Sequence, residues 1–232
     1  MKIEIWSDFA CPFCYIGKRK LEKAIENFPH KDKIEVIYRS YELNPNAKET
    51  VTNKGYEAFS ESKGVSVDEA KKMFDQLELT AKAYDLDYKM SEILMASTRK
   101  AHRLAKWANT FNKEHEFTEL VFDAYFTKGA NIATDEVLLG FIEQVGLNKE
   151  EAKKVIKENM FDDLVTNQIN EGVSLGLRGV PFFVFNRKFA VAGAQPDEHF
   201  IEALNKAYEE GPLNHVGGHA GCGCSDDGCE VK

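Results

Sequence analysis

Cysteine is missing from about two hundred residues in the middle of this 232-residue chain. All five cysteines fall into two short groups, Cys11 and Cys14 near the start and Cys222, Cys224 and Cys229 near the end. A secreted fold held together by disulfides would spread its cysteines along the chain. Two local groups in a reducing compartment indicate redox or metal chemistry instead.

Basic residues are also scarce, because 30 lysines and arginines stand against 38 acidic residues and give a net charge of −8. Nucleic-acid binding needs clustered positive charge, so this balance argues against it. No apolar run approaches the roughly 18 residues of a membrane span. The first residues, MKIEIWSDFACPFC, contain no basic, long apolar or cleavage-like stretch. We therefore expect no secretory signal, no membrane partner and a cytoplasmic location.

Strand and helix patterns predict a β–α–β unit over residues 1–44. Residues 2–7 and 34–40 are rich in β-branched and aromatic side chains, and a helix follows from Pro12. The C-x-x-C pair therefore lies where the first strand meets a helix.

Residues 45–160 have mostly helical periodicity, and we expect their aromatic residues, such as Trp107 and Phe122, to pack a core. Residues 161–212 predict a helix over 161–177, an apolar strand, a hairpin at Asn186-Arg187, a second strand and a last helix. Residues 213–232 carry few large apolar side chains, which predicts a flexible tail. The fold class is thus α/β, with the large helical segment inserted between residues 1–44 and 161–212.

The C-x-x-C pair is a candidate redox centre. Zinc sites use the same spacing, and two buried cysteines are a further alternative, but no second ligand pair lies nearby in sequence. A helix N-terminus stabilises a thiolate through its partial positive charge and unpaired N–H groups. Cys11 precedes the first turn and Cys14 lies one turn inside, so we predict a reactive Cys11 and a shielded, resolving Cys14.

Two further segments are candidate substrate contacts. Pro12 and Phe13 lie between the cysteines, and Phe13 cannot donate a hydrogen bond to a thiolate as histidine would, which predicts a less oxidising disulfide. Val180-Pro181 opens an apolar strand, and we predict a cis peptide bond there, packed against the cysteine pair. The backbone of Val180 would then bind an extended substrate.

Two acidic residues are candidates for tuning the cysteines. Glu4 lies in a strand that should be central, and a buried carboxylate there would accept or relay the proton that Cys14 loses. An exposed Glu4 at the strand end is the alternative. Asp8 would instead cap the active-site helix or tune the thiolate.

These motifs resemble the DsbA-like thioredoxin superfamily. The likeness rests on Ser7 to Gly17 (SDFACPFCYIG) and on Gly179 to Phe185 (GVPFFVF), and it covers about residues 1–210. More narrowly, the chain resembles the FrnE-like branch, related to 2-hydroxychromene-2-carboxylate isomerases and kappa-class glutathione transferases. The resemblance implies a thioredoxin fold with a large all-helical insertion. It also implies that Cys11 is the nucleophile, Cys14 the resolving cysteine and Pro181 the cis-proline.

The expected function is disulfide exchange with protein or low-molecular-weight thiols by a thiol–disulfide oxidoreductase, with no cofactor required. Isomerase and transferase relatives usually carry serine at the first position and use glutathione, whereas this chain has Cys11. A glutathione-dependent isomerase or transferase remains one alternative. A metal-binding protein with a vestigial redox motif is another.

The last residues form a separate candidate metal site. Four soft or borderline metal ligands lie close together among glycines: Cys222, Cys224, Cys229 and His219. Such a set suits Zn(II) or Cu(I). Two of these cysteines could alternatively form a second redox pair, or the segment could be an unstructured tail with incidental cysteines.

Ending the chain after Pro212 tests these readings of the tail. The deleted residues hold almost no apolar side chain able to pack on a core, so thermal unfolding should be nearly unchanged. The truncation should abolish stoichiometric zinc or copper binding, or slow reduction of the Cys11–Cys14 disulfide. A large fall in melting temperature would instead make the tail structural, and unchanged metal content and redox kinetics would make its cysteines incidental.

Overall fold

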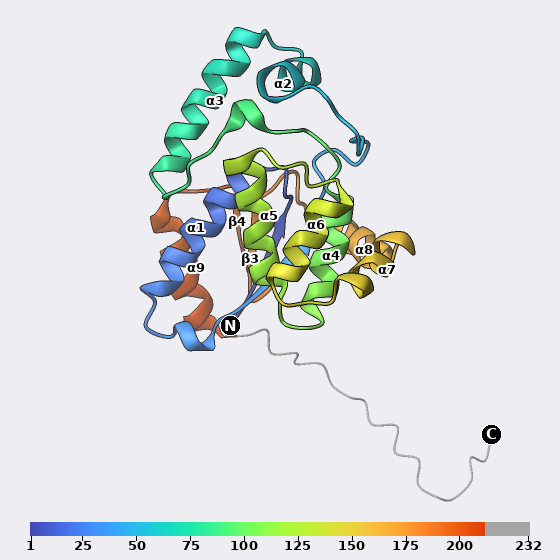
Figure 1. The fold of residues 1–232 in the computed structure, drawn as a ribbon. Coiled ribbons are helices and arrows are strands. Elements are labelled where there is room, and N and C mark those ends of the chain that lie inside the picture. Colours follow the sequence, from blue (N-terminus) through green and yellow to red (C-terminus); the bar gives the residue numbers. More distant parts are fainter. Residues whose placement is uncertain (212–232) are drawn as a thin grey trace, which may run out of the picture.

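A four-stranded mixed sheet lies at the centre of the computed structural model, which describes residues 1–211 (Figure 1). The strand order is β2-β1-β3-β4. The central strand β1 pairs in parallel with β2, whereas β3 runs antiparallel to both β1 and β4. The strands are β1 (Lys2–Ser7), β2 (Glu35–Ser40), β3 (Phe182–Phe185) and β4 (Phe189–Ala192).

Helices α1 (Pro12–Glu26) and α9 (Asp197–Glu210) lie side by side on one face of this sheet (Figure 1). Ile3 and Ile5 of β1 point into the core between them, together with Phe183 and Phe200. Because side chains alternate along a strand, Trp6 points to the opposite face. There its indole N–H donates to the carbonyl of Gln168 in helix α8 (Asp162–Ser174) at 2.8 Å.

The chain between β2 and β3 is helical, as predicted, and the expectation of an α/β thioredoxin fold with a large helical insertion is confirmed. Trp107 and Phe122 are buried in its core, which also includes Cys11 and Cys14. The residue limits of the three predicted units stay predictions. The helices are α2 (Gly55–Lys63), α3 (Val67–Lys82), α4 (Arg99–Asn109), α5 (Glu114–Lys128), α6 (Asp135–Gln144), α7 (Lys149–Lys157) and α8 (Asp162–Ser174), with short 3-10 turns η1 (Lys31–Lys33) and η2 (Met90–Glu92).

The hairpin at Asn186-Arg187 forms as predicted, but one predicted helix ends earlier than expected. Asn186 and Arg187 both have positive φ angles, 49° and 57°, as a two-residue hairpin requires. The helix expected over residues 161–177 is shorter. Gly176 adopts a φ of 86° just beyond α8, and the N–H of Leu177 donates a hydrogen bond to the carbonyl of Gly172. This left-handed turn ends the helix before Leu177.

Helices α2 and α3 stand above the N-terminal end of α1 (Figure 1), and we call residues 55–96 the roof. A capping box of Ser66 and Glu69 starts α3. Two tyrosines tie the region after α3 to the rest of the fold. The hydroxyl of Tyr84 donates to Asp197 at 3.0 Å, and that of Tyr88 donates to the carbonyl of Pro12 at 2.8 Å.

The packing of α8 on the sheet depends on a glycine. A Cβ atom on Gly172 would lie 2.7 Å from two atoms of the Trp6 indole. We expect Gly172→Ala to lower the free energy of unfolding by about 1–3 kcal/mol, because Trp6 is fully buried and has little room to move. Gly140→Ala is the matched control, since nothing lies within 4 Å of its new Cβ. It should stabilise the protein by about 0.5–1 kcal/mol. Equal denaturant midpoints for the two variants would contradict this account.

Candidate functional site

The two motifs that lie far apart in the sequence meet at Cys11. Cys11 is the N-cap residue of α1, with Pro12 in the first turn. Its thiol lies 3.4 Å from the carbonyl oxygen of Val180 and donates to it. The Val180-Pro181 peptide bond is cis, as predicted, and the residue before the proline contacts the first cysteine of the pair. The roles of these residues in a reaction stay predictions.

Close packing beneath the cis-proline depends on Gly17. A Cβ atom at Gly17 would lie 3.0 Å from the Phe183 ring and 3.1 Å from the Pro181 ring. A side chain at this position would push both rings away by a few tenths of an ångström, so glycine favours this close approach of α1 to β3 and the cis-proline. The first two turns of α1 are therefore held directly against the Val180-Pro181 segment.

Cys14 is buried one turn inside α1. Burial, then the hydrogen bond to Cys11 and the charge of Cys11, raise the pKa of the Cys14 thiol well above its ordinary value. A hydrogen bond from the Ser7 hydroxyl to Cys14 lowers this pKa in part. Cys14 is therefore a neutral thiol at neutral pH, as a shielded resolving cysteine should be.

Asp8 is buried beside the cysteines, but it does not cap α1. Cys11 is the N-cap residue of α1, and its side chain makes no capping hydrogen bond. One carboxylate oxygen of Asp8 accepts from the N–H of Ala10, and the other accepts from the N–H of Leu43 at 2.7 Å. The buried His102 of α4 lies 3.3 Å from the first oxygen. Sequence reasoning missed His102, because a lone histidine in an amphipathic helix carries no distinguishing pattern.

Glu4 is buried, as one sequence alternative predicted, but it lies in an ion cluster. Its carboxylate accepts from Arg39 at 2.6 Å and from Arg187 at 2.7 Å. Burial opposes ionisation, yet hydrogen bonds from Arg187 and Arg39 outweigh it and lower the pKa of Glu4. Strand alternation turns Glu4 to the Trp6 side of the sheet, so the geometry gives the predicted proton-relay role no support.

A cavity of about 400 Å³ opens beside Cys11. Its lining includes Pro12, Phe13 and Val180, so it brings together all the predicted substrate contacts except the cis-proline ring. Phe13 is 49% exposed. The roof supplies much of the other wall, with Phe59, Met73, Phe74, Leu77, Met90, Ile93 and Met95.

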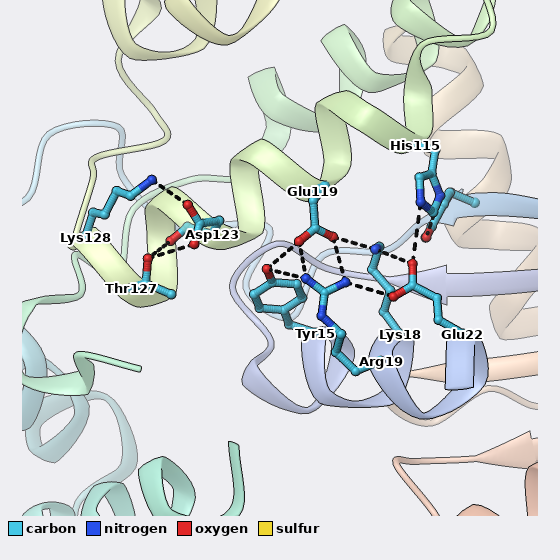
Figure 2. Close-up of polar contacts among 10 residues, drawn as sticks. Tyr15, Lys18, Arg19, Glu22, His115, Glu119, Asp123, Thr127 and Lys128 are labelled. Carbon is cyan, nitrogen blue, oxygen red and sulfur yellow. Dashed lines mark hydrogen bonds and ion pairs between the residues drawn. The ribbon is translucent and has the colours of Figure 1, made fainter. Parts of the chain in front are cut away.

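An ion network holds α1 against α5 of the helical insertion (Figure 2). Glu119 of α5 accepts from the Tyr15 hydroxyl at 2.6 Å and from Lys18 at 2.5 Å, and it also binds Arg19. Glu22 joins the same two basic residues from within α1. Burial opposes ionisation of Glu119, but hydrogen bonds from Arg19 and the charge of Lys18 outweigh it and lower the pKa of this carboxyl to about 2.

The predicted tail ligands Cys222, Cys224, Cys229 and His219 lie outside the described residues. Within residues 1–211, no group of three or more histidine, cysteine or acidic side chains is arranged to hold a metal ion. No helix in the same range is long and apolar enough to cross a membrane.

Replacing Glu119 by glutamine should lower the free energy of unfolding at neutral pH by about 1–3 kcal/mol, because two basic side chains lose a charged partner. The folded-state pKa lies below the ordinary value, so this stabilisation is present above about pH 4.5 and is lost as the pH falls toward 2. Denaturant unfolding of both proteins across this range measures the difference.

Glu116→Gln on the same helix is the control, since the partner of Glu116 within residues 1–211 is Lys113, at the surface. It should change stability little at any pH. A loss for Glu119→Gln that did not depend on pH would show that the ion network contributes no charge-dependent stability.

Known proteins share this architecture. The chain is 35% identical to a solved structure described as a probable DsbA oxidoreductase from Streptomyces coelicolor. The match covers 100% of this chain and 99% of that one, with a TM-score of 0.88. It is 25% identical over 207 residues to the uncharacterised protein YwbO of Bacillus subtilis, covering 88% of this chain and 95% of that protein.

A solved 2-hydroxychromene-2-carboxylate isomerase shares the fold at 14% identity, with a TM-score of 0.69 over 90% of this chain and 98% of its own. The isomerase likeness is one of fold alone. The model of the DSBA-like thioredoxin domain matches residues 2–205. The chain therefore belongs to the DSBA-like thioredoxin domain family.

Proposed function

We propose that this protein is a thiol–disulfide oxidoreductase that uses the Cys11–Cys14 pair to exchange disulfides with protein or low-molecular-weight thiols. The contact of the Cys11 thiol at the start of α1 with the Val180 carbonyl beside the cis-proline carries the proposal. It places a thiol at a helix N-terminus, where a thiolate is stabilised, against a backbone segment able to bind substrate. Cytoplasmic location remains a prediction from the sequence.

The reaction begins at Cys11. Its thiolate attacks one sulfur of a substrate disulfide, forming a mixed disulfide and releasing the first substrate thiolate. Cys14 then attacks the Cys11 sulfur, which forms the Cys11–Cys14 disulfide and releases the second substrate thiol. The substrate gains two electrons and the protein pair loses them. The same steps run backwards when the partner couple is the stronger reductant.

The environment of Cys14 sets the order of these steps. Part of the rise in its pKa comes from the negative charge of Cys11, and that charge disappears once Cys11 is in a mixed disulfide. The Cys14 thiol then loses its proton more readily, while the Ser7 hydroxyl stabilises the thiolate that forms. Cys14 is thus protected before substrate binds and activated afterwards.

A glutathione-dependent isomerase or transferase is the second candidate function. The cavity beside Cys11 supplies the space that such an enzyme needs for its apolar substrate, while the lining offers few partners for the charged groups of glutathione. Cys11→Ser separates the two functions. An isomerase should remain largely active, whereas disulfide exchange should fall to the uncatalysed rate.

Two measurements test the proposal. Reduction of insulin by wild type, Cys11→Ser and Cys14→Ser should proceed catalytically only with the wild type, and Cys14→Ser should accumulate a mixed disulfide. Partial alkylation of the reduced wild type at neutral pH, followed by mass spectrometry, should label Cys11 first. Preferential labelling of Cys14, or full insulin reduction by Cys11→Ser, would refute the assignment.

A further inference from the structure

The cavity beside Cys11 has a lining that selects for uncharged ligands. We infer that its substrate is a low-molecular-weight disulfide with an apolar, uncharged body, taken in preference to glutathione disulfide. This inference rests on the proposed disulfide exchange at Cys11 and names the class of molecule that the exchange serves.

The cavity lies between two parts of the fold. On one side, Cys11 and Phe13 line it from the start of α1 and Val180 lines it from the cis-proline segment. On the other side, residues of α2 and α3 line it from the roof. A volume of about 400 Å³ falls within the range of small-molecule sites, about 300–1,000 Å³. A small disulfide held between the two parts has the sulfur of Cys11 in the wall beside it.

The roof gives this wall an apolar and adaptable surface. Met73, Met90 and Met95 line the cavity together with Phe59 and Phe74. Methionine is flexible and polarisable, so such a wall adjusts to aromatic or branched groups of different shape. Met73 is 52% exposed and Phe13 is 49% exposed. A bound apolar group would cover both side chains and remove that surface from water.

The charged groups of glutathione find few partners here. Asp8 and Lys63 are the charged residues in the lining. Both carboxylate oxygens of Asp8 already accept hydrogen bonds from backbone N–H groups. The other polar lining residues include Asn44, Thr98 and Tyr125, which are uncharged. Glutathione disulfide carries four carboxylates and two ammonium groups, and burying them without partners costs free energy.

The kinetic test uses two probes, dithiodipyridine as a neutral aromatic disulfide and glutathione disulfide as a charged one. Cys11 attacks one sulfur of dithiodipyridine and releases a pyridinethiolate, and Cys14 then releases the second while the protein pair becomes a disulfide. Stopped-flow rates with reduced wild type are divided by the rates of dithiothreitol with the same probes, which corrects for the intrinsic reactivity of each disulfide. The corrected rate should favour dithiodipyridine by about tenfold or more.

Two variants of α3 locate the effect. Met73→Glu places a charge in the cavity wall, and Leu79→Glu places the same charge on the same helix at a side chain that is 64% exposed and not part of the lining. Met73→Glu should slow dithiodipyridine by about tenfold and glutathione disulfide far less. Leu79→Glu should leave both rates unchanged. Equal effects of the two variants, or a corrected rate that favours glutathione disulfide, would overturn the inference.

Binding without chemistry separates this inference from the proposed function. Dipyridyl sulfide, a thioether that cannot exchange, should bind Cys11→Ser in calorimetry and should bind Cys11→Ser/Met73→Glu at least about tenfold more weakly. Absence of binding to Cys11→Ser would refute the apolar cavity. If the thioether binds but no disulfide reacts faster than with dithiothreitol, the proposed function fails and the apolar site stands. Insulin reduction slowed by Met73→Glu as strongly as dithiodipyridine would place a polypeptide in the cavity and overturn the choice of a small substrate.

Discussion

The contact between the Cys11 thiol and the Val180 carbonyl organises the site, because it joins segments that lie 169 residues apart in sequence. Strand register makes the contact possible. Trp6 of β1 pairs with Phe182 of the antiparallel β3. The residues that follow β1 therefore lie beside the residues that precede β3, at the same end of the two strands. Gly17 then lets α1 pack directly on Pro181. A slip in this register would separate the thiol from the cis-proline and would leave two cysteines without a substrate-binding backbone.

The helical insertion contributes to the chemistry as well as to the core. Its α5 holds α1 through Glu119, as Figure 2 shows, and its α4 places His102 against Asp8, which lies in the loop before Cys11. Its roof supplies the apolar wall of the cavity. The thioredoxin part therefore places the Cys11 sulfur, and the insertion supplies much of what surrounds it.

Glu4 and Asp8 show why a buried carboxylate cannot be assigned a role from its position alone. Both are buried and both lie close to the cysteines in sequence. Alternation along β1 turns Glu4 toward Arg39 and Arg187, whereas Asp8 follows the strand and remains in the cysteine loop. The arginine partners of Glu4 come from β2 and from the hairpin before β4. No local sequence pattern predicts these ion pairs, because they form only when residues from β1, β2 and the hairpin before β4 come together.

The α/β architecture, the order of its strands and helices, the Asn186-Arg187 hairpin and the two motifs that meet at the site could be predicted from the residues alone. These features follow from periodicity, turn chemistry and residue spacing, which act over a few neighbouring residues. The folded chain was needed to show that Glu4 belongs to an ion cluster, that His102 contacts Asp8 and Glu119 contacts α1, and that the roof forms an apolar wall beside Cys11. Those outcomes depend on contacts between distant segments, and side-chain burial and charge pairing there are set by the packing of whole elements.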